Sequence, residues 1–357
     1  MVRNFLLLFV LAISSQVCLA ATTLKQIEVD GAPTSIVLPE NTSTPDGMTV
    51  AKDGKIYLSM LNLQVPAQPA VWTVDADNQL QKLIDLPKHP ETDGVFPLGI
   101  AQGKDGNLYV ADNQTFGANN AHQSRLLRVV MKDDKAVRVE TVATGLIAAN
   151  AVEAHGKRIY VTETCLINDA KPHVSGLYKF ELDELSADNP VQLEPDGADP
   201  RLVAKFTTEA DDWRSDIGAN GLAISPQGVL YVCNFGEASI LTAPLKEDGF
   251  LAEPLKVLVK GDGIGSTDGM KYVPAIKKLV VADFFSNAIH LVSPRTGRVK
   301  TVAQNPNSDG AGGKLDKPSE PCVRGTTLYA SNIDLPYDGN EPDKPDSLTV
   351  IQLKITE

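Results

Sequence analysis

The sequence predicts an all-β fold, a six-bladed β-propeller with four antiparallel strands per blade. Three observations lead to this prediction. A pattern of strands and turns recurs about every 50 residues, which is typical of repeat architectures. The pattern occurs six times, and each repeat has room for four strands. No segment shows a sustained apolar period of about 3.6 residues, so nothing indicates a long amphipathic helix.

The six repeats share a local order of signals. Each opens with a small or polar pair and an apolar alternation, passes through a turn that usually holds Gly, and then opens a second strand. In five repeats that second strand begins with an aliphatic residue followed by Tyr. Hairpin turns such as Lys52-Asp53-Gly54 and Pro226-Gln227-Gly228 join the two strands. The repeats open at Asp46, Leu98, Asn150, Asn220, Asp268 and Glu320.

The outer strands and the ends of the chain complete the prediction. Third and fourth strands are expected at 70–74 and 80–84 in the first repeat, and equivalent pairs follow later. Residues 187–201 are expected to form an insertion loop in the third blade. The N-terminal strand 24–29 and the C-terminal strand 347–355 are expected to close the ring in the sixth blade, which removes exposed sheet edges. Residues 335–345, rich in Pro, form a long loop inside that blade.

Composition narrows the class of protein. The chain has 357 residues, of which 43% are hydrophobic, and a formal net charge of −12. This hydrophobic content is too high for an intrinsically disordered chain. Its surplus of acids argues against a nucleic acid or an anionic membrane as partner, because both need a basic face.

The first twenty residues resemble a cleaved secretory signal. Arg3 precedes an apolar run at 5–13 that is too short to span a bilayer, and Ala20 offers a small residue before the cleavage point. We therefore expect residues 1–20 to be a signal peptide, residues 21–357 to be one propeller domain, and the protein to be periplasmic or secreted. No second segment approaches a membrane span.

Three cysteines remain after the signal. Cys165, Cys233 and Cys322 cannot all pair with one another, so either two of them form a disulfide or all three are free thiols. Their spacing matches no zinc site.

The residues that open the six repeats are candidates for a metal site. Taken singly, an Asp-Gly or Asn-Gly pair is typical of a turn. In a propeller, however, these positions are related by rotation and converge on the central tunnel. Carboxylates that converge raise one another's pKa unless a cation neutralises them. Five of the six positions carry side-chain oxygens.

Four of these residues form the predicted ligand set. Asp46 and Asp268 supply carboxylates, and Asn150 and Asn220 supply carbonyl oxygens. Oxygen donors suit a hard divalent cation, so we expect calcium first, with magnesium, manganese or zinc as alternatives. Calcium takes about six to eight ligands, so four protein oxygens leave positions for water or substrate.

The same residues carry a resemblance to a known family. Residues 220–232 and Asp268-Gly269-Met270, within the frame of six repeats, resemble the SMP-30/gluconolactonase/LRE-like family of six-bladed propellers. More distantly they resemble paraoxonase and diisopropyl-fluorophosphatase enzymes. The resemblance implies a calcium or similar ion held by Asp46, Asn150, Asn220 and Asp268. Asp46 stands where the family usually has Glu.

The resemblance also implies an activity, which is metal-assisted hydrolysis of a lactone or ester. It makes Asp268 a candidate to activate water, and Glu320 a second candidate, because some relatives place a catalytic His where the sixth blade opens. The expected partner is a small-molecule substrate. The alternatives are a non-catalytic propeller with a structural metal that binds a sugar or protein, and another propeller enzyme such as a sugar oxidoreductase.

Substrate specificity is expected in the loops of the propeller, since loops carry function and vary freely. The candidate loops lie at 60–70, 112–124, 163–175 and 333–346. His173, in the third of them, could reach the mouth of the tunnel. The sequence leaves the oligomeric state open.

Overall fold

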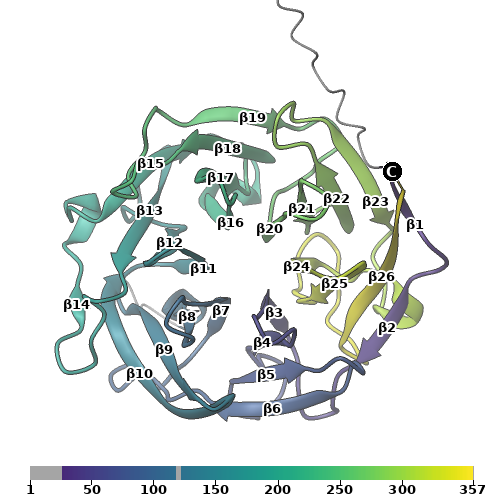
Figure 1. Cartoon of the computed structure of the whole chain (residues 1–357), viewed down its shortest axis with the longest axis horizontal. Coiled ribbons are helices and arrows are strands. Elements are labelled where there is room, and N and C mark those ends of the chain that lie inside the picture. The colour runs from purple at the N-terminus through teal and green to yellow at the C-terminus, as the bar shows by residue number, and fades with distance from the viewer. Residues whose placement is uncertain (1–25, 118–121, 357) are drawn as a thin grey trace, which may run out of the picture.

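The computed structural model describes residues 26–117 and 122–356. These residues form six sheets arranged as blades around a central axis (Figure 1). In the first five blades the chain starts at the axis and moves outward strand by strand. The predicted six-bladed β-propeller is confirmed.

The first five blades are built from consecutive strands. Blade one consists of β3 (Pro45–Val50), β4 (Ile56–Met60), β5 (Ala70–Val74) and β6 (Leu80–Asp85). Blade two consists of β7 (Pro97–Gln102), β8 (Leu108–Asp112), β9 (Ser124–Lys132) and β10 (Lys135–Leu146). Blade three consists of β11 (Ala149–His155), β12 (Arg158–Glu163), β13 (His173–Glu181) and β15 (Leu202–Thr208). Blade four consists of β16 (Ala219–Ile224), β17 (Val229–Asn234), β18 (Ser239–Pro244) and β19 (Lys256–Lys260). Blade five consists of β20 (Met270–Val273), β21 (Lys278–Asp283), β22 (Ala288–Val292) and β23 (Val299–Gln304).

The sixth blade closes the ring with both ends of the chain, as expected. It contains β24 (Pro318–Arg324), β25 (Thr327–Asn332) and the long β26 (Ser347–Thr356). Two N-terminal strands, β1 (Gln26–Val29) and β2 (Thr34–Val37), pair antiparallel with the two ends of β26. The sequence did not predict β2, because its four residues are only partly buried and show no clear apolar alternation.

The insertion in the third repeat is more structured than expected. Residues 187–201 contain β14 (Val191–Gln192) and the 3₁₀ turn η2 (Pro195–Gly197). β14 pairs in parallel with β10, so the insertion adds a short strand to the outer edge of blade two instead of forming a loop within blade three. Val191 and Leu193 are buried in the core there, and this burial of apolar surface explains the difference. The other 3₁₀ turns are η1 (Gln114–Phe116), η3 (Trp213–Asp216) and η4 (Ala311–Gly313).

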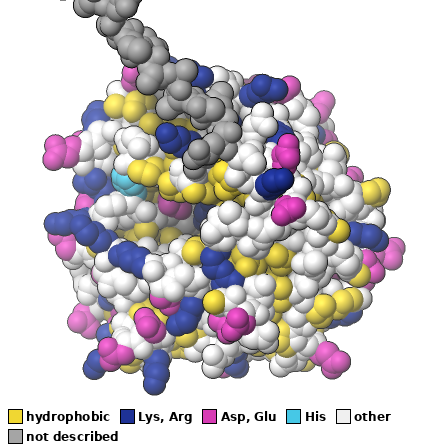
Figure 2. Space-filling model, turned by 45° about the vertical axis from the view of Figure 1, so that its right-hand side comes forward, with side chains coloured by type: hydrophobic (Ala, Val, Ile, Leu, Met, Phe, Trp, Pro, Cys, Tyr) yellow, Lys and Arg dark blue, Asp and Glu magenta, His cyan; other side chains and the backbone are white. Residues whose placement is uncertain are grey.

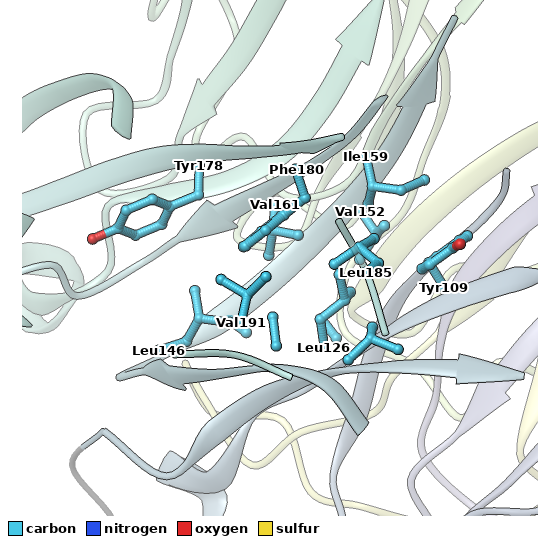
Figure 3. Close-up of a cluster of buried hydrophobic side chains, with 14 of the residues drawn as sticks. Tyr109, Leu126, Leu146, Val152, Ile159, Val161, Tyr178, Phe180, Leu185 and Val191 are labelled. Carbon is cyan, nitrogen blue, oxygen red and sulfur yellow. The ribbon is translucent and has the colours of Figure 1, made fainter. Parts of the chain in front are cut away.

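The hydrophobic core consists of layers between neighbouring blades. The layer between blades two and three joins Tyr109 and Leu126 to Val152, Val161 and Phe180 (Figure 3). Similar clusters lie between each other pair of neighbours, so every blade is held on both faces. The recurring Tyr of the second strands is buried in these layers. The Tyr residues are Tyr57, Tyr109, Tyr160, Tyr231 and Tyr329.

A bulge recurs where the first strand of a blade meets the axis. In blade four the register shifts between Ala219 and Leu222, and equivalent shifts occur in blades one, two, three and six. A bulge re-aims a side chain, and here it turns the residue that opens the repeat toward the tunnel. Asp46-Gly47 and Asn220-Gly221 therefore lie within strands and not in turns.

Acidic and basic side chains are interspersed over the face in Figure 2, with apolar side chains between them. In the described ranges no helix has the length and apolar character that crossing a bilayer requires. The predicted signal peptide, residues 1–20, lies outside those ranges.

Candidate metal centre

A cavity of about 460 Å³ lies at the central axis. One end of the cavity is lined by the residues that open the repeats of five blades, four of which are polar. These residues are Asp46, Leu98, Asn150, Asn220 and Asp268. The structure thus brings together all four side chains that the sequence predicted as metal ligands, and it adds Leu98 as an apolar member of the ring.

Burial and neighbouring charges raise the pKa of both carboxylates in the cavity. Burial raises the pKa of Asp268 well above its ordinary value, and the charges of Asp46 and Glu320 raise it further. Burial raises the pKa of Asp46 to about 7, again with a contribution from Glu320. A hydrogen bond from the Asn220 side chain opposes the shift at Asp268. Two acids in this position need a positive charge beside them to stay ionised at neutral pH.

The donor set fits a hard divalent cation. It combines two carboxylates with two carboxamides, and oxygen donors of this kind are those that calcium prefers. Asp46, Asn150, Asn220 and Asp268 are the residues that would hold such an ion.

Hydrogen bonds between blades fix the backbone of these candidate ligands. Ser331 Oγ donates to the carbonyl oxygen of Asp46 at 2.6 Å. Thr162 Oγ1 donates to the carbonyl oxygen of Asn220 at 2.9 Å. Asp268 is held on both sides, because its N–H donates to the Ala282 oxygen and its carbonyl accepts from Gly221 N at 3.1 Å. Ligands held in this way are preorganised for a bound ion or substrate.

Glu320 does not line the cavity among the described residues. Its Oε1 forms an ion pair of 2.7 Å with Lys271 Nζ, and Glu153 Oε2 lies 3.9 Å from the same nitrogen. The three residues come from the innermost strands β24, β20 and β11 and are enclosed in the tunnel. Glu320, predicted as a second candidate, thus lies outside the cavity lining that holds Asp268.

The other half of the cavity is apolar. Phe235, Phe284 and Ile333 form a buried cluster with Ile217 and Leu335 packed against it. At its edge the ring of Trp213 stacks on Tyr337, with ring centroids 5.2 Å apart and planes inclined by 13°. The sequence did not predict this apolar wall, because its members come from separate loops and become neighbours only in the fold.

The specificity loops were predicted in part. Residues from 112–124, 163–175 and 333–346 line the cavity, but none from 60–70 does among the described residues. The segment 213–217, which includes Trp213, was missed. In the sequence, this segment is marked only by an isolated Trp in a polar loop.

His173 lies in the cavity wall and is buried. Its Nε2 lies 2.7 Å from the carbonyl oxygen of Thr164, so Nε2 carries the proton and donates. Cys165 also lines the cavity, and burial raises its pKa to about 11, which keeps it a thiol at neutral pH. Cys165, Cys233 and Cys322 are all free, so the open question of a disulfide among them is answered.

Comparison with known proteins places the fold. No family model and no curated protein matches the sequence. A PQQ-bound aldose sugar dehydrogenase from Streptomyces coelicolor is 14% identical with a TM-score of 0.57, covering 92% of this chain and 98% of that one. A putative gluconolactonase is 15% identical with a TM-score of 0.57, covering 92% and 94%. A gluconolactonase from Xanthomonas campestris is 13% identical with a TM-score of 0.54, covering 92% and 98%.

These likenesses establish the propeller fold. The predicted resemblance to gluconolactonase propellers is confirmed at that level, since two of the neighbours are described as gluconolactonases. The sugar dehydrogenase shares the fold equally well, so the fold alone does not select a reaction. The residues that line the cavity must therefore determine the reaction.

Proposed function

We propose that this protein is an exported hydrolase of lactones or esters that works with a divalent cation, calcium first. The observation that carries the proposal is the meeting of two buried carboxylates and two carboxamides at one wall of a cavity whose other wall is apolar. The gluconolactonases among the structural neighbours support a lactonase-type reaction on this fold. The signal-like segment 1–20 supports export.

When bound, a divalent cation would polarise the carbonyl group of the substrate. We assign Asp268 to accepting a proton from the attacking water, because it lies in the cavity and forms no ion pair with a described basic residue. Asn220 hydrogen-bonds the Asp268 carboxylate and keeps it oriented. Asp46, held at its backbone by Ser331, supplies the second negative charge.

The apolar wall selects the substrate. Phe235, Phe284 and Ile333 offer no hydrogen-bonding side chains, so they favour an apolar or aromatic substituent over the hydroxyl groups of a sugar. Trp213 and Tyr337 are partly exposed at the edge, where a flat group can stack on them. We therefore propose lactones and esters with an apolar substituent as the substrate class.

Asp268→Asn tests the assignment, since it keeps the size of the side chain and removes its charge. We expect calcium to bind more weakly and hydrolysis of the preferred substrate to fall by about 100-fold or more. Glu320→Gln should lower hydrolysis by less than about tenfold, because Glu320 acts on the cavity only through its field. Calcium titration of metal-stripped protein and a panel of lactones and aryl esters provide the measurements.

Asp53→Asn, in the hairpin turn of blade one, is the matched control and should change neither property. Full hydrolysis by Asp268→Asn would refute the role of Asp268. Calcium binding that depends on Asp268, without turnover of any substrate in the panel, would favour the alternative of a binding propeller with a structural metal.

A further inference from the structure

A second group of acids lies outside the cavity, at the sixth blade. Asp316 precedes β24, Asp334 follows β25, and Asp343 lies in the loop between β25 and β26. One carboxylate oxygen from each lies within 4.8 Å of the other two. Calcium–oxygen distances of about 2.4 Å put opposite ligands about 4.8 Å apart, so the spacing matches a shared ion.

Burial of these carboxylates lowers the stability of the folded protein unless a cation neutralises them. Asp316 and Asp334 are only 3% and 2% exposed, whereas Asp343 reaches the surface. The Asp334 carboxylate accepts hydrogen bonds from Asn340 Nδ2 at 2.7 Å and from Asp343 N at 2.9 Å. Asp316 Oδ1 is buried and has no hydrogen-bond partner. Asp316 therefore offers a buried carboxylate oxygen that no protein group occupies, next to two further carboxylates.

The nearby basic side chains point elsewhere. Lys317 Nζ lies over the ring of Phe284, 5.4 Å from its centroid, and 3.9 Å from Asp338. Lys344 pairs with Asp346. Among the described residues no ion pair involves Asp316, Asp334 or Asp343, and the one nearby cation that acts on Asp316, Lys317, does so from beyond ion-pair distance. In agreement with this, burial and the charges of Asp334 and Asp343 raise the pKa of Asp316 to about 8.

We propose that Asp316, Asp334 and Asp343 bind a second divalent cation, calcium by preference, which fastens the 334–346 loop to the sixth blade. The donors are all carboxylate oxygens, as a hard cation requires. Two ligands, Asp334 and Asp343, belong to this loop, while Asp316 anchors it to the segment before β24.

The second ion would bear on the cavity through the same loop. Leu335 and Tyr337 line the cavity, and Tyr337 stacks on Trp213. Fixing Asp334 and Asp343 therefore positions the aromatic edge of the cavity without any contact between the ion and the substrate. The proposal does not depend on hydrolysis, because the binding of the ion can be measured directly.

Calcium titration of the metal-stripped mature protein by calorimetry is the test. Wild type should bind two calcium ions, and Asp343→Asn should lose one of them or bind it at least about tenfold more weakly. Asp343 is exposed, so this substitution disturbs folding least. Asp338→Asn, an exposed acid of the same loop, is the matched control and should keep both sites.

Asp268→Asn separates the two sites. In this variant the remaining ion should bind at the sixth blade and change the fluorescence of Trp213, and adding Asp343→Asn should abolish that change. Two calcium sites of unchanged affinity in both Asp343→Asn and Asp316→Asn would overturn the proposal. So would a single site in wild type that Asp268→Asn removes.

Discussion

The position of the candidate ligands depends on how closely the first strands of neighbouring blades approach. Gly221 N donates to the Asp268 oxygen, and Gly221 sits directly beside the backbone of residues 268–270. A Cβ atom at Gly221 would lie 2.7 Å from Met270 N and 2.8 Å from Gly269 C, and it would collide with the Asp268 oxygen. Ordinary contacts begin at 3.4 Å, so Gly221→Ala must separate the strands by at least about 0.7 Å at Met270 N, and by more at the Asp268 oxygen.

This shift is large for a metal site. Ligand distances in such sites are held to about 0.2 Å, and a misplacement of about 1 Å near the chemistry costs about 100-fold in rate. Asn220 and Asp268 flank the contact on either side, so both would move. We expect Gly221→Ala to weaken calcium binding at least about tenfold and hydrolysis about 100-fold, although it removes no ligand atom. Overpacking should lower the free energy of unfolding by about 1 to 3 kcal/mol.

Gly106→Ala is the matched control. Gly106 lies in a hairpin turn of blade two with φ +86°, and a Cβ atom there would meet nothing within 4 Å. Ala should therefore cost about 1 to 2 kcal/mol of stability through backbone strain, with calcium affinity unchanged. Calorimetry, substrate hydrolysis and urea unfolding compare the two variants. Wild-type calcium affinity in a folded Gly221→Ala protein would refute the idea that close approach of the blades positions the ligands.

Two further predictions concern pH and substrate preference. Burial raises the pKa of Glu163 to about 8, although hydrogen bonds from the Ala148 and Ile147 N–H groups oppose this shift. The ionised form of Glu163 is therefore disfavoured in the folded protein, so its effect on stability is most favourable below the ordinary pKa of 4.5 and worsens as pH rises toward 8. Glu163→Gln should gain stability relative to wild type by at least about 1 kcal/mol between pH 5 and 8 in urea unfolding, and an equal pH dependence would contradict this. Trp213→Ala should lower kcat/KM about tenfold for an aromatic ester but little for a small aliphatic lactone, and an equal loss on both would exclude stacking as the cause.

The polar half of the cavity could be predicted because it follows from the repeat. Asp46, Asn150, Asn220 and Asp268 are distant in sequence, yet rotation about one axis brings equivalent positions together. The local conformation was less predictable. The Asp-Gly and Asn-Gly pairs look like turns, and only pairing between strands reveals a bulge.

The repeat did not predict the apolar half of the cavity or the second acidic group. Trp213 and Tyr337 lie in segments without a repeat position, and their stacking depends on the paths of two loops. Asp316, Asp334 and Asp343 follow no spacing that marks a cation loop, and they meet only because β24 and β25 pair and the following loop folds back. Sequence patterns report periodic structure, and these contacts are not periodic.

The residues that open the repeats differ from the loop residues in how they could alter the chemistry of the propeller. The six positions that open the repeats are fixed in space by interblade contacts, so their side chains can be exchanged without moving the backbone. At Leu98 the ring already holds an apolar residue between Asp46 and Asn150. Function in this fold is therefore set by side chains at a few symmetric positions and by the loops above them, and the closely packed glycines keep the frame constant.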